Sequence, residues 1–516
     1  MSRRSSGSRG AQARAARSSD RAAGAGAALA PPPSPRHLAF VLAALVAASC
    51  VLVSVTFVLR ETDLWQHLAV GRWIWQMHAF PTHQLWTWPN YGTRDVNASW
   101  GFRLLIWPLW NWFGVTGLYL WRWASALAVF GLLWAAARRM GAAGLSPLIV
   151  LVLCSLSYRQ RSAIRPETLA SLLMAAEIWI LETWRARRAA ALARAHESAG
   201  AAGARQLPDL RPMLVLVSWA WANVHISYWM GFAIQGIYFV SECLAPPGRR
   251  AEGRRAPLLG RLGLTGWRAP AAVMLASAAI SFANPWGWRA LWQPVDYLLH
   301  WRHEPIFRII SELAPLDWRA NLTNLLPLLI GGWAALLLWT LVRRRADFVE
   351  CALFVTFVSL ALWTQRFMGF LAVVAAPFLA RGLDQLVRSR AHARISEGRR
   401  WLGAALAALL CVLIGIPEWQ RPTLPLGVGI DWRVVPVRAC DFLEQHGVRG
   451  RAFNEFEAGG YLVYRFWPDR SRLPFIDVHQ SGSREDRYLY VWARQDSAGW
   501  AALDGKYHFD YVLVFT

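Results

Sequence analysis

Long runs of apolar residues alternate with short polar segments along most of this chain. A run of about 20 apolar residues is long enough to cross a bilayer as a helix. Eleven apolar runs, some of them shorter than this, recur through the chain, at 38–59, 115–137, 145–158, 168–184, 213–225, 227–244, 270–284, 322–342, 348–363, 367–384 and 402–416. The pattern predicts a mainly α, polytopic membrane protein of about eleven transmembrane helices.

The two ends of the chain have different patterns from the middle. Residues 1–36 are Arg, Ser, Ala, Gly and Pro, which cannot bury a core, so we predict a disordered cytoplasmic tail. Residues 417–516 mix apolar and polar positions, with helical spacing over 436–447 and β-like runs in RAFNEF, YLVYRF, LPFIDV and YVLVF. We predict an extracytoplasmic α/β domain there, after a transmembrane domain over 37–416.

Two further helices are predicted outside the spans, both in a first outside loop over 60–114. The apolar segment 100–113 is short and broken by Pro108, which favours a helix lying at the membrane interface. A helix over 63–78 would place Asp63 and His67 four residues apart on one face.

Composition sharpens the class and the orientation. The 516 residues are 55% hydrophobic and 17% charged, with a formal net charge of +23. So basic a chain suggests nucleic acid, but the apolar runs exclude a soluble nucleic-acid-binding protein. The segments predicted inside carry 30 arginines and those predicted outside carry 12. This asymmetry predicts a cytoplasmic N-terminus and an exported C-terminal domain.

Ionisable residues beside membrane spans are costly and often functional. In this topology the unusual polar residues all fall on the outer side of the membrane. The candidate site residues are Glu61, Asp63, His67, Arg165, Glu167, Asn223, His225, Asn284, Glu312 and Arg366. Their chemistry suits an anionic, lipid-linked substrate.

Asp63, Glu61 and His67 are the candidate catalytic group. Two carboxylates and an imidazole can supply a general base, and Asp63 could hold a divalent metal ion (Mg or Mn) with a phosphate ligand. The alternative is structural: Thr62 or Asp63 would cap an interfacial helix in solvent.

The remaining candidates also have structural alternatives. Arg165 and Arg366 suit phosphate because guanidinium groups match its oxygens, but snorkelling toward lipid headgroups is equally compatible. His225 has the alternative of a hydrogen-bonded packing residue. Asn284 precedes a proline, a pattern typical of a helix end, and Glu312 has the alternative of a solvated loop residue.

With these residues in view, the chain resembles the polytopic GT-C-type glycosyltransferases. More narrowly, it resembles bacterial membrane proteins related to the protein O-mannosyltransferases and the lipid A aminoarabinose transferases, over roughly 60–516. The matching motifs, in chain order, are Glu61 to Trp73, Arg165-Pro166, Trp221 to His225, Asn284 to Trp288, Arg366, Phe453-Asn454, Gly459 to Leu462 and Phe475 to Asp477.

The resemblance implies transfer of a sugar from a polyprenyl phosphate or pyrophosphate on the extracytoplasmic face. It implies Asp63 as base or metal ligand, with Glu61 as its helper, and Arg165 and Arg366 as ligands of the lipid phosphate. The chain departs from the group in several motifs. Where the group usually has His-Glu-Trp-Leu, this chain has Ala98-Ser99-Trp100-Gly101, so a second carboxylate is missing.

Two hypotheses follow from these observations. The first is a glycosyltransferase of the bacterial inner membrane, whose partners are the bilayer, the polyprenyl-linked sugar and an envelope glycan, lipid or protein acceptor. The second is a non-catalytic scaffold or lipid-carrier-binding protein of envelope assembly. A transporter ranks below both because no repeat of spans is evident, and a nucleic-acid partner is not expected.

Overall fold

The computed structural model describes residues 36–197, 209–244, 267–390, 397–479 and 482–515. The predicted tail, apart from Arg36, lies outside these ranges. The described part of the chain is mostly helical, as the sequence predicts.

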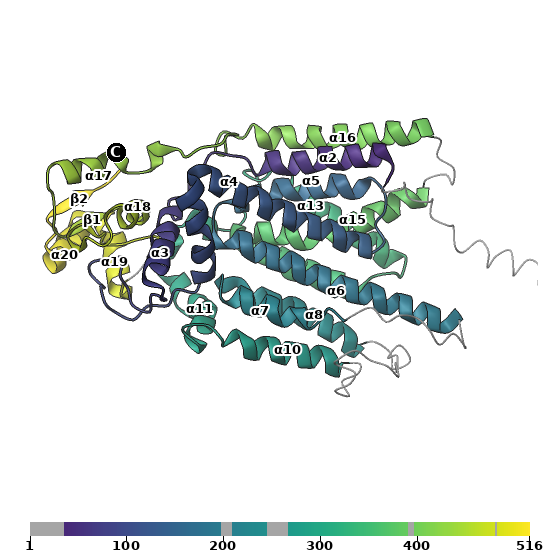
Figure 1. Cartoon of the computed structure of the whole chain (residues 1–516), viewed down its shortest axis with the longest axis horizontal. Coiled ribbons are helices and arrows are strands. Elements are labelled where there is room, and N and C mark those ends of the chain that lie inside the picture. Colours follow the sequence, from purple (N-terminus) through teal and green to yellow (C-terminus); the bar gives the residue numbers. More distant parts are fainter. Residues whose placement is uncertain (1–35, 198–208, 245–266, 391–396, 480–481, 516) are drawn as a thin grey trace, which may run out of the picture.

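Each of the eleven apolar runs forms a helix, because a backbone surrounded by apolar side chains must satisfy its own hydrogen bonds. The helices are α2 (Leu38–Ser54), α4 (Trp100–Arg139), α5 (Ser146–Tyr158), α6 (Pro166–Glu197), α7 (Met213–Ala222), α8 (Trp229–Leu244), α10 (Arg268–Ser281), α13 (Leu326–Val342), α14 (Phe348–Trp363), α15 (Met368–Arg390) and α16 (Glu397–Trp419). They run side by side and form an elongated bundle (Figure 1).

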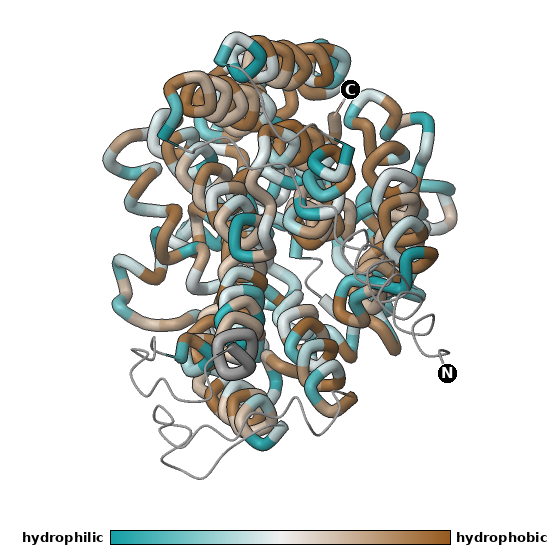
Figure 2. Tube along the Cα trace, turned by 90° about the vertical axis from the view of Figure 1, so that its right-hand side faces the viewer, coloured by the Kyte–Doolittle hydropathy of each residue, from teal (hydrophilic) through white to brown (hydrophobic). Residues whose placement is uncertain are grey.

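Three helices in the described ranges are long and apolar enough to cross a membrane, by length and composition: Trp100–Arg139, Gln365–Arg390 and Glu397–Trp419. Others, including α2, α7, α10, α13 and α14, are apolar but shorter. Large apolar side chains also lie on the outside of the bundle. Along α16, for example, Leu402, Leu406 and Leu409 are each more than half exposed. Figure 2, viewed along the bundle, shows apolar residues on its outer helices. Such a surface suits lipid rather than water.

The interior of the bundle is built around α15. Nearly every residue of its first half is buried, and it packs against α4, α5, α6, α13 and α14. Small residues such as Gly369 allow this closeness, because a Cβ there would lie 2.6 Å from Cβ of Arg161.

One end of the bundle is covered by helices that lie across it (Figure 1). Helix α3 (Leu64–Met77) packs against the first part of α4. At Gly114, which has φ 55° and ψ −135°, α4 turns sharply, and its remainder enters the bundle. The residues before Gly114 therefore form a separate helix, as the sequence predicts over 100–113, and its place at the membrane interface stays a prediction. Short helices follow α10 at the same end: α11 (Trp288–Leu299), η4 (Trp301–His303), α12 (Pro305–Arg308) and η5 (Ser311–Leu313).

The C-terminal residues form a small helical unit with one two-stranded sheet. Its elements are α17 (Val437–Gln445), β1 (Ala452–Asn454), α18 (Phe456–Phe466), η8 (Arg470–Arg472), α19 (Arg484–Ala493), α20 (Ser497–Tyr507) and β2 (Tyr511–Leu513). The strands are parallel, with Ala452 opposite Tyr511 and Asn454 opposite Leu513. The predicted helix over 436–447 and the strands in RAFNEF and YVLVF are confirmed.

Two of the predicted strands are wrong. The run YLVYRF belongs to α18, and a six-residue apolar run does not distinguish a strand from a buried helix. The run LPFIDV is buried without a strand partner. There the side chain of Asn454 accepts a hydrogen bond from the backbone N–H of Phe475 at 2.7 Å and donates one to the carbonyl of Ile476 at 2.9 Å. These bonds replace a strand ladder.

The C-terminal unit and the first outside loop share one hydrophobic core. Trp65 of α3 packs edge-on against Tyr461 of α18, with ring centroids 4.9 Å apart. Gly460 brings the two helices close, because a Cβ there would lie 2.7 Å from the carbonyl oxygen of Thr62. The division of the chain into domains at 416–417 stays a prediction, but residues on both sides of it meet beside Asp63.

Candidate functional site

A cavity of about 800 Å³ lies between the covered end of the bundle and the C-terminal unit. Residues of α3, the loop before α4, the start of α6, the α11–η5 region, η6 (Gln365–Phe367) and the C-terminal unit line it. Seven of the ten candidate residues are among them: Asp63, His67, Arg165, Glu167, His225, Glu312 and Arg366.

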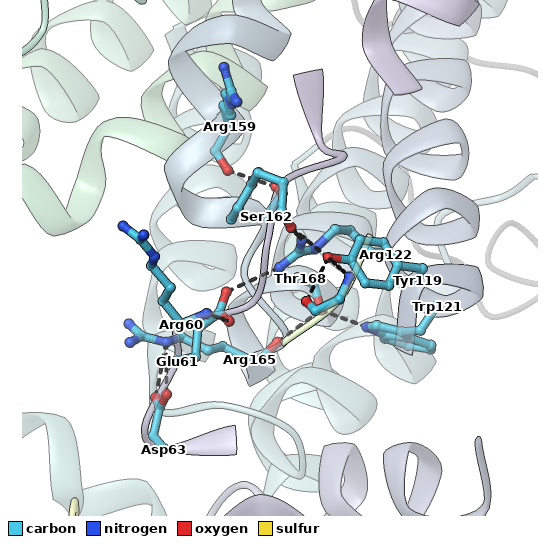
Figure 3. Close-up of polar contacts among 12 residues, drawn as sticks. Arg60, Glu61, Asp63, Tyr119, Trp121, Arg122, Arg159, Ser162, Arg165 and Thr168 are labelled. Carbon is cyan, nitrogen blue, oxygen red and sulfur yellow. Dashed lines mark hydrogen bonds and ion pairs between the residues drawn. The ribbon is translucent and has the colours of Figure 1, made fainter. Parts of the chain in front are cut away.

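Asp63 is the N-terminal neighbour of α3, but its side chain makes no capping hydrogen bond. Its carboxylate instead pairs with Arg165, whose Nε lies 3.0 Å from Oδ2 (Figure 3). The same guanidinium also pairs with Glu312, and Arg161 Nη1 lies 3.0 Å from the other oxygen of Glu312. The capping alternative for Asp63 and the solvated-loop alternative for Glu312 are therefore wrong for this structure.

A second ion-pair group surrounds Glu167, in the first turn of α6. Arg366 Nη2 lies 2.9 Å from Oε1 of Glu167, and His225 Nε2 lies 3.6 Å from the same oxygen. His225 accepts a hydrogen bond at Nδ1 from the backbone N–H of Ser227 at 3.2 Å, which leaves its Nε2 proton facing Glu167. The two carboxylates Glu167 and Glu312 therefore hold Arg366 and Arg165 at the cavity wall.

The carboxyls of the cavity have opposite pKa shifts. Burial raises the pKa of Asp63 to about 6 despite the opposing charge of Arg165, and Glu312 adds to the rise. Burial would also raise the pKa of Glu312, but Arg161, Arg165 and Arg366 together lower it to about 2. Near neutral pH, Glu312 stays ionised while Asp63 is poised to exchange a proton.

His67 lies one turn after Asp63 and also lines the cavity. Its Nδ1 accepts a hydrogen bond from Arg103 Nε at 3.1 Å. Arg103 is fully buried and also bonds Asn97 and His479. Burial holds the pKa of His67 well below its usual range, and Arg103 adds to this shift. His67 is thus a neutral imidazole fixed in orientation.

Three candidates lie outside the cavity lining. Glu61 pairs with the buried Arg122 at 3.1 Å (Figure 3), so it supports the fold and does not assist Asp63 directly. Asn223 accepts from Trp100 Nε1 at 2.9 Å and donates to the carbonyls of Trp219 and Ala283. Asn284 accepts from the backbone of Trp286 at 2.9 Å, as a helix end requires.

Several residues in the cavity lining or directly behind it were not singled out from the sequence. Arg103 has no acidic residue at helical spacing and sits in an apolar segment, so nothing in the pattern distinguishes it from an interfacial arginine. Asp95 also lines the cavity, four residues before Ser99. His479 comes from the C-terminal unit. It lies two residues after the Phe-Ile-Asp motif, which was the only signal near it in the sequence.

The residues present fit a resident divalent metal poorly. Among the described residues, no group of three or more His, Cys, Asp and Glu side chains is arranged to hold a metal ion. Asp63 and Glu312 are both engaged by arginines, and a metal at Asp63 would have to displace Arg165. The chemistry proposed for this site therefore includes no metal-dependent step.

Comparison with known proteins supports the fold. No protein-family model matches the sequence, and no curated protein matches it. Among solved structures, the chain is similar to the crystal structure of the Archaeoglobus fulgidus oligosaccharyltransferase in complex with Zn and sulfate. The TM-score is 0.52 at 14% sequence identity, covering 92% of this chain and 67% of that one. At this identity the likeness is one of fold alone.

Proposed function

We propose that this protein is a membrane glycosyltransferase of the bacterial inner membrane. It would move a sugar from a polyprenyl phosphate or pyrophosphate to an envelope glycan, lipid or protein on the extracytoplasmic face. The proposal rests on the fold and, above all, on one observation. Asp63, with a pKa raised to about 6, lies in a cavity directly beside Arg165, with Arg366 on the same cavity wall.

The chemistry follows from these side chains. The acceptor hydroxyl oxygen attacks the anomeric carbon as the bond from that carbon to the phosphate oxygen breaks, which inverts the configuration. The hydroxyl proton passes to the carboxylate of Asp63. The leaving phosphate keeps the bonding electrons, and Arg165 and Arg366 stabilise its charge because guanidinium forks match phosphate oxygens.

The aromatic and aliphatic part of the cavity fits the same substrate. Tyr297, Trp301 and Phe307 line it beside Ile309, Ile310 and Leu313. A sugar ring packs well on aromatic faces, and the first residues of a polyprenyl chain need apolar surroundings.

A non-catalytic carrier-binding protein is the second candidate function. Ala98 and Ser99 line the cavity, so the carboxylate that the related group usually has nearby is missing from the site itself. A protein of this kind would bind the lipid phosphate through Arg165 and Arg366 without transferring the sugar.

Turnover separates the two functions. The full chain, purified in lipid nanodiscs, is incubated with radiolabelled polyprenyl-phosphate sugars and an extract of envelope acceptors. We expect loss of the lipid-linked sugar and labelling of an acceptor. Saturable binding of the same lipids without release of polyprenyl phosphate would favour the carrier-binding function.

A further inference from the structure

The buried guanidinium of Arg103 makes its hydrogen bonds to neutral groups. Arg103 donates to Nδ1 of His67, to Oδ1 of Asn97 and to Nε2 of His479. Within the described residues, no carboxylate lies within ion-pair distance of it. A buried cation held only by neutral acceptors leaves a positive potential in its surroundings.

The hydrogen bonds of Arg103 fix where the two imidazole protons lie. A nitrogen that accepts from Arg103 cannot carry a proton, so a neutral His67 is protonated at Nε2 and a neutral His479 at Nδ1. Burial holds the pKa of both histidines well below the usual range, and Arg103 adds to the shift. Neither of these N–H groups bonds another described residue, and both histidines line the cavity.

Asn97 adds a third donor to this cluster. Its side chain is 1% exposed, its Oδ1 accepts from Arg103, and its Nδ2 has no hydrogen-bond partner. A buried amide donor left without a partner is costly, and a ligand oxygen would satisfy it. Donors from three segments of the chain thus surround one buried positive charge.

Three carboxyl groups oppose the charge of Arg103, and Asp95 has the largest effect, ahead of Asp477 and Asp63. Asp95 lines the cavity, and its Oδ1 accepts a hydrogen bond from the backbone N–H of Val96 at 2.8 Å. Burial raises its pKa, and the hydrogen bond from Val96 and the charge of Arg103 oppose this shift. Its charge reduces the positive potential of Arg103 but fills none of the free donors.

We propose that His67, Asn97, Arg103 and His479 form a second anion subsite, which binds a phosphate or carboxylate group of the acceptor. The identification of this group with the acceptor rests on the proposed function, because Arg165 and Arg366 already account for the phosphate of the donor lipid. The cluster comes from α3, the loop before α4, the first part of α4 and the C-terminal unit, whereas Arg366 comes from η6 in the bundle. In this arrangement His67 donates to the acceptor and leaves proton removal to Asp63.

The test is anion binding by the full chain in nanodiscs, measured by equilibrium dialysis with radiolabelled inorganic phosphate. His479→Leu removes one donor, and we expect the dissociation constant of phosphate to rise about fivefold. Asp95→Asn removes the largest of the opposing charges, and we expect tighter binding. Arg366→Gln is the matched comparison. It removes an arginine assigned to the donor phosphate, so phosphate binding at the second subsite should remain. Acetate competition shows whether a carboxylate binds as well as a phosphate.

Two outcomes would overturn the subsite. One is phosphate binding that is unchanged by both His479→Leu and Asp95→Asn but lost with Arg366→Gln. The other concerns inorganic pyrophosphate. If it binds far more tightly than phosphate, and either His479→Leu or Arg366→Gln removes that difference, the cluster belongs to the donor diphosphate. Neither measurement requires turnover, so a failed transferase assay leaves this test intact.

Discussion

Asp63 and Glu312 share the guanidinium of Arg165, yet their carboxyls have opposite pKa shifts. Glu312 is held by two arginines and Asp63 by one, while neighbouring acids surround Asp63. The difference separates two roles. Glu312 holds the arginines in place, and Asp63 is left as the group able to take a proton near neutral pH.

The substitution Asp63→Asn tests that role. Because general base catalysis contributes about 10²–10⁴-fold, we expect sugar transfer to fall by roughly that factor. Arg165 keeps Glu312 as its partner, so the melting temperature should change little. Transfer by the purified variant is measured beside its thermal unfolding.

Glu61→Gln serves as the matched control for this substitution. It removes the partner of the buried Arg122, so it should lower the melting temperature more than Asp63→Asn does. Full activity in the Asp63 variant would refute the role of this carboxylate.

The pKa of Asp63 also predicts a pH profile. A base acts in its ionised form, so kcat/KM should be constant above pH 7 and fall about tenfold per unit as pH drops below about 6. Glu312, with its pKa lowered to about 2, stays ionised throughout this range. Initial rates between pH 4.5 and 8.5 in nanodiscs measure the profile. A rate independent of pH across 5–8 would contradict the assignment.

At the scale of elements, the site depends on close contact between α18 and the start of α3. Gly460 of α18 lies against the backbone of Thr62, the residue before Asp63. The contact involves a backbone carbonyl, which cannot swing aside as a long side chain can. Any added atom at Gly460 must therefore move a helix or the loop that carries Asp63.

Gly460→Ala is expected to destabilise the protein by about 1–3 kcal/mol, because its Cβ would lie 2.7 Å from the carbonyl oxygen of Thr62. Gly505→Ala is the control in the same unit. No atom lies within 4 Å of a Cβ there, and an alanine in that helix should stabilise by up to about 1 kcal/mol. Thermal unfolding of both variants measures the difference. Equal melting temperatures would show that the two helices separate without cost.

Sequence patterns predicted the elements better than their contacts. The apolar runs predicted all eleven bundle helices, because a helix satisfies its backbone hydrogen bonds locally, but only three of the described helices are long and apolar enough to cross a membrane. YLVYRF was assigned wrongly because it packs as a helix against α3, which lies far away in the sequence, and no local pattern shows that contact. The ion pairs between Asp63 and Arg165 and between Glu167 and Arg366 join residues 102 and 199 positions apart, so no local spacing encodes them. Arg103 escaped notice for the same reason.

For the whole molecule, the net charge of +23 and the apolar surface have separate explanations. The apolar outer faces of helices such as α16 suit the bilayer, and the arginines concentrate in the segments predicted inside. The cavity lies at the end of the bundle that carries the C-terminal unit. We therefore propose that this end faces away from the cytoplasm.

Cysteine labelling tests this orientation. In a background without the six native cysteines, Tyr488→Cys places a thiol on the exposed surface of α19, and Arg345→Cys places one between α13 and α14. A membrane-impermeant maleimide added to spheroplasts should modify Cys at 488 and leave 345 unmodified until the membrane is opened. The reverse pattern would place the cavity in the cytoplasm.

One wall of the cavity comes from residues 417–516, which are synthesised after all the bundle helices. In the proposed orientation, these residues must cross the membrane before Gly460 can reach α3 and His479 can reach Arg103. The bundle would therefore insert before its cavity is complete, and export of residues 417–516 would complete it. Under the proposed function, a chain stalled before this export would lack a finished site and would leave lipid-linked sugar unconsumed.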